Sequence, residues 1–304
     1  MTADFKQLFK DRDTAEVRRI PARLLYRAPE GEEGEVSVEL ATRGHSRLTY
    51  QVCEFPPIRV YLPPREERPP LWRGQHALKL TVNCKPRDRR YEQFLLEEYL
   101  IYRIYNLFTD LSYRVRLARG TYIQEAKGDT VAATWAFFVE DADDLARRHG
   151  GEDYEEPGVR FRDVDEKTMA LMAVFEYLIG NTDWGLPVLH NVRVLKLPPG
   201  VYYPVPYDFD FSGLIKTPYA GPSRQLSIRS VRERLYRGPC LPMDAFQPIF
   251  AIFNEKRPEI EALFKTTEGL DPKRVESHLG YIGDFYQTIS NPGKVDREFR
   301  YVCG

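Results

Sequence analysis

Several features are scarce in this chain, and each scarcity argues against a class of protein. No apolar run approaches the roughly 20 residues that a transmembrane helix needs. Basic and acidic residues nearly cancel, leaving a formal net charge of -1, whereas general nucleic-acid or membrane-surface binders carry a basic excess. With five histidines and no C-x-x-C pair, a zinc site is not expected. The first residues lack the basic-then-apolar plan of a signal peptide, as would a chain that begins at its mature N-terminus.

The four cysteines, at positions 53, 84, 240 and 303, are dispersed along the chain. An even number is compatible with two disulfides, Cys53–Cys84 in the N-terminal half and Cys240–Cys303 in the C-terminal half. Four buried free thiols in a cytoplasmic protein would give the same sequence. Composition alone leaves both alternatives open.

The length of 304 residues and the 42% hydrophobic content suit two packed parts, each with its own core. Residues 1–140 are expected to be mainly β, with one long helix over Tyr91–Phe108, where apolar residues recur in helical register. Alternation and turn residues predict the strands of this part. They are residues 22–26, 36–40, 77–82, 113–117 and 131–140.

Residues 141–304 differ in character, because helices dominate them and two acidic segments lie on loops. We expect helices at Glu166–Leu178, Met243–Phe264 and Val275–Ile289. The prediction is an α+β, bilobal protein-kinase-like fold. Its β-rich N-lobe (1–140) with one long helix would bind nucleotide, and its mainly helical C-lobe (141–304) would carry the catalytic and metal-binding loops, with a hinge at 141–144.

Asp183 ends a Gly-Asn-Thr-Asp turn that follows an apolar helix. Phosphoryl transfer needs a carboxylate that orients the attacking hydroxyl and accepts its proton, which contributes ~10²–10⁴-fold to the rate. A helix cap or a closed turn would use the same residues structurally. The second acidic segment of the chain favours the catalytic interpretation of Asp183.

Asp208 and Asp210 follow the strand-like residues 201–205. Alternate residues of a strand share a face, so both carboxylates are expected to point the same way, where a divalent cation would remove their repulsion. Asn191 lies between the two acidic segments and offers an amide oxygen. The three residues predict a Mg²⁺ or Mn²⁺ site, although one aspartate capping the turn at Ser212 is the structural alternative.

Lys79 lies inside an apolar strand, and Glu98 follows nineteen residues later in the apolar stripe of the long helix. A buried lysine and a buried carboxylate each need a partner. Their separation suits a strand lysine that binds ATP phosphates and is held by a helix glutamate. Glu97 and Lys85 are the competing residues, and a solvent-facing Lys79 is the structural alternative.

Two further segments are expected to contact the nucleotide. The turn containing Arg43 and Gly44 would close over the phosphates with backbone N–H groups and a guanidinium, although an ordinary hairpin turn would look alike. Glu140 ends the segment 138–140, whose position suggests an adenine-facing linker.

These residues together resemble the CotH family of spore-coat and surface kinases and, more distantly, HipA-type kinases. The family combines an R-G-N-S-like turn, here Arg43–Ser46, with an N-x-D segment, here Asn181–Asp183, and a D-x-D segment, here Asp208–Asp210. The likeness spans residues 35–215. It implies that Asp183 is the catalytic aspartate, Asp208 the metal aspartate and Asn191 the metal-binding asparagine, with ATP and Mg²⁺ or Mn²⁺ as cofactors.

The chain departs from the family pattern at two places. Trp184 stands where the family usually has an arginine after the aspartate. Asn191 lies eight residues beyond Asp183, where about five is usual, so an insertion containing Pro187 must bulge out. Without that bulge, Asn181 would become the candidate metal ligand.

The resemblance implies a kinase that transfers phosphate from ATP to a Ser or Thr of a protein acceptor, or a close variant that transfers the adenylyl group. A catalytically silent binding scaffold of a surface or coat assembly is the non-enzymatic alternative. A hydrolase whose two aspartates hold a water-activating metal is the third. Because CotH-like kinases often act at surfaces, the resemblance favours an extracytoplasmic location and the two disulfides. The basic segment Val231–Arg237 is expected to be a solvated helix face, with an acidic-substrate grip as its alternative.

Overall fold

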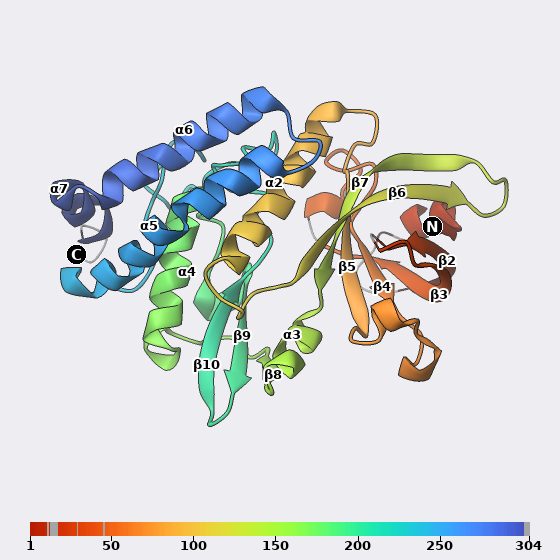
Figure 1. Cartoon of the computed structure of the whole chain (residues 1–304), viewed down its shortest axis with the longest axis horizontal. Coiled ribbons are helices and arrows are strands. Elements are labelled where there is room, and N and C mark those ends of the chain that lie inside the picture. Colours follow the sequence, from red (N-terminus) through yellow and green to blue (C-terminus); the bar gives the residue numbers. More distant parts are fainter. Residues whose placement is uncertain (11, 13–17, 29, 45, 301–304) are drawn as a thin grey trace. The chain divides into compact units, whose positions relative to one another are not determined.

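A computed structural model describes residues 1–10, 12, 18–28, 30–44 and 46–300 (Figure 1). The chain divides into two compact units. Unit 1 comprises Met1–Leu95 and Arg114–Asp144, and unit 2 comprises Leu96–Tyr113 and Leu145–Gly304. Helix α2 (Arg89–Asn106) begins in unit 1 and ends in unit 2, and the short helix α3 (Ala142–Arg148) crosses the later boundary.

Unit 1 is built on a closed seven-stranded barrel with the strand order β1-β2-β3-β4-β5-β7-β6. The two-residue strand β1 closes it, because Thr2 pairs with Arg23 in antiparallel and with Ile123 in parallel register. The terminal ammonium of Met1 donates to the Thr121 carbonyl at 2.7 Å and so anchors this strand. The strands are β1 (Thr2–Ala3), β2 (Ile20–Arg27), β3 (Glu33–Thr42), β4 (Ile58–Tyr61), β5 (Ala77–Val82), β6 (Val115–Gln124) and β7 (Thr130–Glu140), and the short helix α1 is Phe5–Lys10.

The closed barrel overturns the expected fold class. We predicted a bilobal protein-kinase-like fold, and the chain instead has a closed mixed barrel plus a helical C-terminal region. The prediction was wrong because barrel closure depends on β1, which is too short to show any periodicity in the sequence. The single elements were easier to predict, since the expected strands 77–82 and 131–140 match β5 and β7.

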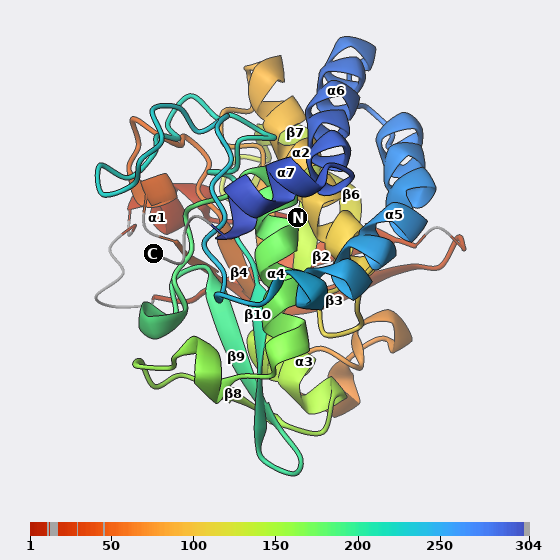
Figure 2. The same cartoon turned by 90° about the vertical axis from the view of Figure 1, so that its left-hand side faces the viewer.

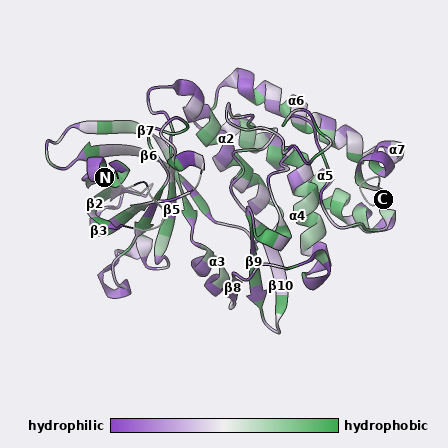
Figure 3. Cartoon of the chain, turned by 180° about the vertical axis from the view of Figure 1, so that it is seen from behind, coloured by the Kyte–Doolittle hydropathy of each residue, from purple (hydrophilic) through white to green (hydrophobic). Residues whose placement is uncertain are grey.

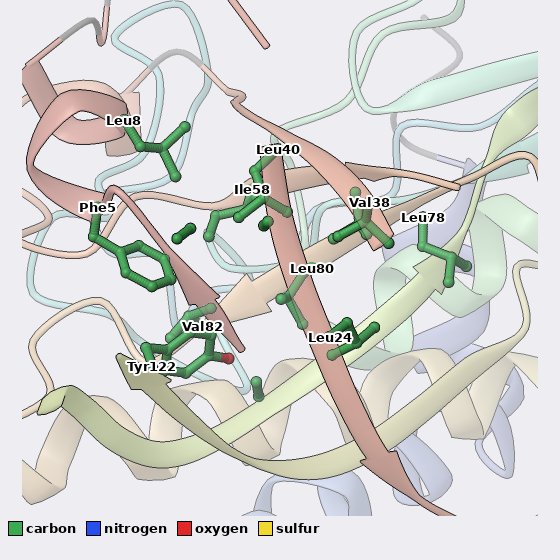
Figure 4. Packing of buried hydrophobic residues seen from close by; sticks show 14 of the residues in the cluster. Phe5, Leu8, Leu24, Val38, Leu40, Ile58, Leu78, Leu80, Val82 and Tyr122 are labelled. Carbon is green, nitrogen blue, oxygen red and sulfur yellow. The ribbon is translucent and has the colours of Figure 1, made fainter. Parts of the chain in front are cut away.

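Alternate strand residues fill the barrel. Along β2, Ile20, Ala22 and Leu24 are buried while their neighbours are exposed, as the period of two requires. Burial of one such aliphatic side chain contributes about 1.5–3 kcal/mol. Figure 4 shows the labelled core side chains, which come from α1 and from strands β2 to β6: Phe5, Leu8, Leu24, Val38, Leu40, Ile58, Leu78, Leu80, Val82 and Tyr122.

A disulfide joins Cys53 and Cys84, whose Cα atoms lie 4.7 Å apart. Both cysteines are buried, and the bond ties the segment after β3 to the segment after β5. Free thiols are therefore the wrong alternative for this pair. The second expected pair, Cys240–Cys303, includes a residue outside the described part of the chain.

Unit 2 combines a three-stranded antiparallel sheet, order β10-β9-β8, with long helices. Helix α4 lies against β10 and packs on α5 and α6 (Figure 2). The side chain of Asp165 caps its start by accepting from the Thr168 amide at 2.8 Å. The elements are β8 (Glu152–Tyr154), α4 (Glu166–Ile179), β9 (Val192–Leu197), β10 (Val201–Pro206), α5 (Met243–Thr266), α6 (Pro272–Ile289) and α7 (Pro292–Val295).

The two long C-terminal helices are amphipathic. Phe246, Phe250 and Phe253 are buried on one stripe of α5, and Figure 3 shows hydrophilic and hydrophobic residues interspersed along α5 and α6. The predicted helices 166–178, 243–264 and 275–289 match α4, α5 and α6. Within the described ranges, no helix has both the length and the apolar content to span a membrane.

Candidate functional site

The predicted catalytic and metal residues of unit 2 gather where the β9–β10 hairpin meets the end of α4. The hairpin ladder ends with Val192 opposite Pro206 and is extended by one bond, in which the Tyr207 amide donates to the Asn191 carbonyl at 3.0 Å. Asn191 and Asp208 therefore leave the sheet at the same end. The two loops that carry the candidate residues start from one rigid base.

Two glycines hold the loops together. Gly180 ends α4 with φ of 65°, a left-handed conformation that favours glycine, and its carbonyl accepts from the Gly213 amide at 3.0 Å. A Cβ at Gly180 would lie 2.0 Å from the Tyr281 hydroxyl, and one at Gly213 would lie 2.2 Å from the Val231 carbonyl. Neither position has room for a side chain, which fixes the spacing between the two acidic segments.

Asp183 is held by three neighbours. Its amide donates to Oδ1 of Asn181 at 3.0 Å, which shapes the turn. The Asn191 amide donates to the Asp183 carbonyl at 2.7 Å and to carboxylate Oδ2 at 3.1 Å. Nε2 of His190 lies 3.0 Å from the other oxygen, Oδ1. Both carboxylate oxygens are thus oriented by side chains.

The residues between Asp183 and Asn191 form a closed loop. Gly185 and His190 exchange two backbone hydrogen bonds, at 2.9 and 3.0 Å. Pro187 and Val188 lie exposed at its tip. The insertion therefore bulges out, and Asn191 lies next to Asp183. The side-chain oxygen of Asn181, the alternative metal ligand, accepts a hydrogen bond from the Asp183 amide.

Backbone strain concentrates at the same loops. Among the described residues, the non-glycine positions with positive φ are Leu189, Asn191, Asp208 and Lys216, at 51°, 53°, 61° and 56°. Such conformations cost on the order of 1–3 kcal/mol each and persist where surrounding structure imposes them, often at functional sites. Asn191 and Asp208, both predicted metal ligands, belong to this group.

Asp208 is fixed through its backbone and through its neighbour Phe209. The Asp208 amide donates to the Tyr102 hydroxyl at 2.9 Å. Phe209 is fully buried, with its ring centroid 4.8 Å from that of Tyr102 and 5.7 Å from that of Phe175. This packing sets the direction in which the Asp208 carboxylate leaves the loop. Tyr102 was not among the predicted site residues, because its role depends on a contact 106 residues along the chain.

Asp210 differs from Asp208 in its environment. β10 ends at Pro206, so the two aspartates do not alternate on a strand, and our reason for placing them on one face was wrong. Asp210 is buried, and its Oδ2 accepts from the Tyr219 hydroxyl at 3.0 Å. Its carbonyl accepts from the Thr217 hydroxyl at 2.9 Å. Asp210 thereby anchors the segment that follows it, through Thr217 and Tyr219.

The chemistry of the donor set fits a hard divalent cation. The amide nitrogen of Asn191 donates to Asp183, so the side-chain oxygen is the atom that could bind a cation. With Asp208 and Asp210 the set offers only oxygen ligands, which Mg²⁺ and Mn²⁺ prefer. In the part of the chain that the structure describes, no three His, Cys, Asp or Glu side chains group as a metal site, so any cation would also need the amide and the substrate phosphates.

Arg237 stabilises the Asp183 loop from a distant segment. Its Nη1 donates to the carbonyls of Thr182 and Trp184, both at 2.5 Å, and its guanidinium lies 5.5 Å from the Trp184 ring centroid. Burial lowers the pKa of Arg237, an effect opposed by the nearby Asp183 and Glu176 carboxylates. Arg237 thus places a guanidinium beside Trp184, the position at which the family usually has an arginine in its sequence.

The segment Val231–Arg237 is not the solvated helix face that we expected. It has no helical structure. Arg234 donates to the Leu178 carbonyl at the end of α4 and to the Tyr281 carbonyl, and it stacks on the Tyr281 ring at 3.7 Å. The arginines were predicted as surface charges because a sequence shows their polarity but not the carbonyl groups that they reach.

Glu176 is buried in the last turn of α4, which the Asp183 loop follows in the chain. Neither carboxylate oxygen has a hydrogen-bond partner among the described residues, and the same is true of the Asn181 amide nitrogen. Burial raises the pKa of Glu176 well above its usual range, and the Asp183 charge adds to this shift. Burial therefore favours the protonated, uncharged form of this glutamate.

The predicted nucleotide-binding residues fall mainly in unit 1. Lys79 is half-buried on β5, Gly44 has φ of 100°, and Arg43 donates to the Thr81 hydroxyl at 3.5 Å. Glu140 is buried at the end of β7 and accepts from the Arg114 amide at 3.2 Å. His45, in the turn of the R-G-N-S-like motif, lies outside the described residues.

Glu98 is buried on α2 in the part assigned to unit 2, and the Lys79–Glu98 pair stays a prediction. The competitor Glu97 has partners within unit 2: it is fully buried and pairs with Arg274 at 2.7 Å and with His278 at 2.6 Å. The other competitor, Lys85, lies over the Tyr91 ring at 5.0 Å. Glu97 therefore has a structural role, which leaves Glu98 as the stronger candidate.

Comparisons with known proteins supply no family. No protein-family model matches the chain, and no curated protein matches it. The likeness to CotH-type kinases stays a prediction carried by the three motifs.

Proposed function

We propose that the protein is a phosphotransferase, transferring phosphate from ATP with Mg²⁺ or Mn²⁺ to a Ser or Thr hydroxyl of a protein acceptor, as the resemblance to CotH-like kinases implies. The proposal rests on the site rather than on the fold class. The observation that carries it is the contact between Asn191 and Asp183, with Asp208 leaving the same end of the hairpin. A catalytic carboxylate and metal-ligating oxygens are the parts that phosphoryl transfer requires.

In this scheme the acceptor hydroxyl lies beside Asp183, whose carboxylate directs removal of its proton. Asn191, Asp208 and Asp210 would hold the divalent cation. When bound, the cation neutralises charge on the transferred phosphoryl group. Lys79, Arg43, Gly44 and Glu140 of unit 1 stay the predicted nucleotide-binding residues, as does Glu98 of unit 2.

An extracytoplasmic location belongs to the same proposal. The buried Cys53–Cys84 disulfide supports it, because structural disulfides persist mainly in oxidising compartments. Surface or secreted action is also what the CotH resemblance implies.

Thermal unfolding with ATP tests the proposal. The midpoint is measured with and without Mg²⁺ or Mn²⁺, for the wild type and for Asp208→Ala. Ligand at 100 times its dissociation constant should add about 2.7 kcal/mol to the free energy of unfolding, and Asp208→Ala should lose the metal-dependent part. No shift with any nucleotide would refute the proposal. Mass spectrometry of the acceptor then separates phosphoryl from adenylyl transfer, because the added groups differ in mass.

A further inference from the structure

His190 was not among the predicted site residues, yet it lies at the reacting carboxylate. Its Nε2 is 3.0 Å from Oδ1 of Asp183. An ionised carboxylate only accepts hydrogen bonds, so this contact requires the proton on Nε2. In the neutral ring the lone pair then lies on Nδ1. Carboxylate and imidazole thus form the arrangement in which an aspartate fixes the tautomer of a histidine base.

The second oxygen of Asp183 is also engaged. Oδ2 accepts from the Asn191 amide at 3.1 Å. A hydroxyl that approaches the carboxylate therefore finds one lone pair of each oxygen already occupied, by His190 and by Asn191. The outer nitrogen of His190 meets no such competition from Asp183, and the ring is exposed, with 54% of its side-chain surface accessible.

The backbone of the loop fixes the position of His190. The residue closes the loop through two backbone hydrogen bonds with Gly185. It is flanked by Leu189 and Asn191, both in the strained left-handed conformation. The turn that holds this imidazole against Asp183 therefore keeps two residues in conformations that cost free energy.

We propose that His190 is the proton acceptor of the site and that Asp183 acts through it. In the transfer step the acceptor hydroxyl oxygen forms a bond to the γ-phosphorus of ATP, and the bond from that phosphorus to the bridging oxygen breaks, releasing ADP. The hydroxyl proton passes to Nδ1 of His190, and the imidazolium that forms is stabilised by the Asp183 carboxylate. The proton returns to solvent after release. This inference rests on the proposed phosphotransferase function and assigns its base.

The test measures ATP turnover and self-phosphorylation of the full chain with ATP and Mg²⁺. His190→Gln should lower kcat by ~10²–10⁴-fold and leave KM for ATP and the ATP-induced midpoint shift unchanged. Added imidazole should restore part of the activity of His190→Ala. It should not restore that of Asp208→Ala.

A second histidine of unit 2 provides the control. His149 contacts Arg148 and the Asp110 carbonyl and has no place in the site, so His149→Gln should behave as wild type. If the wild type turns over ATP but His190→Gln retains turnover within about threefold, the assignment of His190 is wrong while the phosphotransferase proposal stands. If the wild type neither binds nor turns over ATP, both the His190 assignment and the phosphotransferase proposal are wrong.

Discussion

The side-chain amide of Asn191 donates to both the carbonyl and the carboxylate of Asp183, at 2.7 and 3.1 Å. The contact closes a loop whose length exceeds the expected spacing by three residues, since Asn191 follows Asp183 by eight positions instead of about five. It also turns the Asn191 oxygen away from Asp183. One hydrogen-bonded pair thus orients the predicted catalytic carboxylate and a candidate metal ligand together.

Asn191 can be tested by separating its two functions. Asn191→Ala removes both the oxygen ligand and the donor, and we expect the metal-dependent midpoint shift with ATP to disappear. Asn191→Asp keeps an oxygen ligand but replaces the donor with a second carboxylate beside Asp183. It should retain metal-dependent binding and lose ~10²-fold or more in kcat, because Asp183 is no longer oriented. Equal binding by Asn191→Ala and the wild type would exclude Asn191 as a ligand.

Arg237 should matter more than an ordinary surface arginine. Arg237→Ala leaves the carbonyls of Thr182 and Trp184 without their donor, and we expect a loss of about 1–3 kcal/mol in the free energy of unfolding together with reduced turnover. Denaturant unfolding measures the first effect. The exposed Arg224 is the matched control, since Arg224→Ala should stay within about 0.5 kcal/mol of wild type. Equal effects of the two substitutions would contradict the role of Arg237.

Glu176 should make stability depend on pH. Burial raises its folded-state pKa, so above about pH 4.3, the ordinary value, the unfolded chain releases a proton that the folded chain keeps. Stability from this group is therefore lost as pH rises from there toward the folded-state pKa, by up to about 1.4 kcal/mol per pH unit. Glu176→Gln has no such term, so its stability relative to wild type should increase between about pH 5 and 7. A difference that does not change with pH would show that Glu176 is not held neutral.

Glu97 should stabilise unit 2 without taking part in nucleotide binding. Glu97→Leu leaves the half-buried Arg274 and the buried His278 without their carboxylate, and we expect a loss of about 3–5 kcal/mol in the free energy of unfolding. The exposed Glu276 on α6 is the control, because Glu276→Ala should change stability by about 0.5 kcal/mol or less. The ATP-induced midpoint shift of the Glu97 variant should equal that of wild type. Its loss would mean that Glu97 takes part in nucleotide binding.

The disulfide should stabilise unit 1 by restricting its unfolded state. Cys53 and Cys84 are separated by 31 residues, and a closed loop of this length is worth about 3–4 kcal/mol in the chain-entropy model. We expect the double variant Cys53→Ala/Cys84→Ala to unfold at a lower denaturant concentration than the oxidised wild type. Reduction of the wild type should give a similar loss. Unchanged unfolding after both treatments would contradict this role.

Much of the local structure was predictable because it depends on neighbouring residues. Strand β5 and helices α4, α5 and α6 were located from period and breakers alone, since amphipathic repeats and caps act within a few residues. The closed barrel was not predictable, because it requires the pairing of Thr2 with Ile123, more than a hundred residues away, through a strand of two residues.

The site divides in the same way. The sequence by itself determined the acidic segments around Asp183 and Asp208, since side chains that turn the backbone and carry charge can be recognised one at a time. Only the tertiary structure decided that His190 lies on the Asp183 carboxylate, that Arg237 reaches the same loop and that Tyr102 holds Asp208. These contacts depend on distances and hydrogen-bond directions between loops, which a linear sequence does not contain, so they could be found only once the chain was folded.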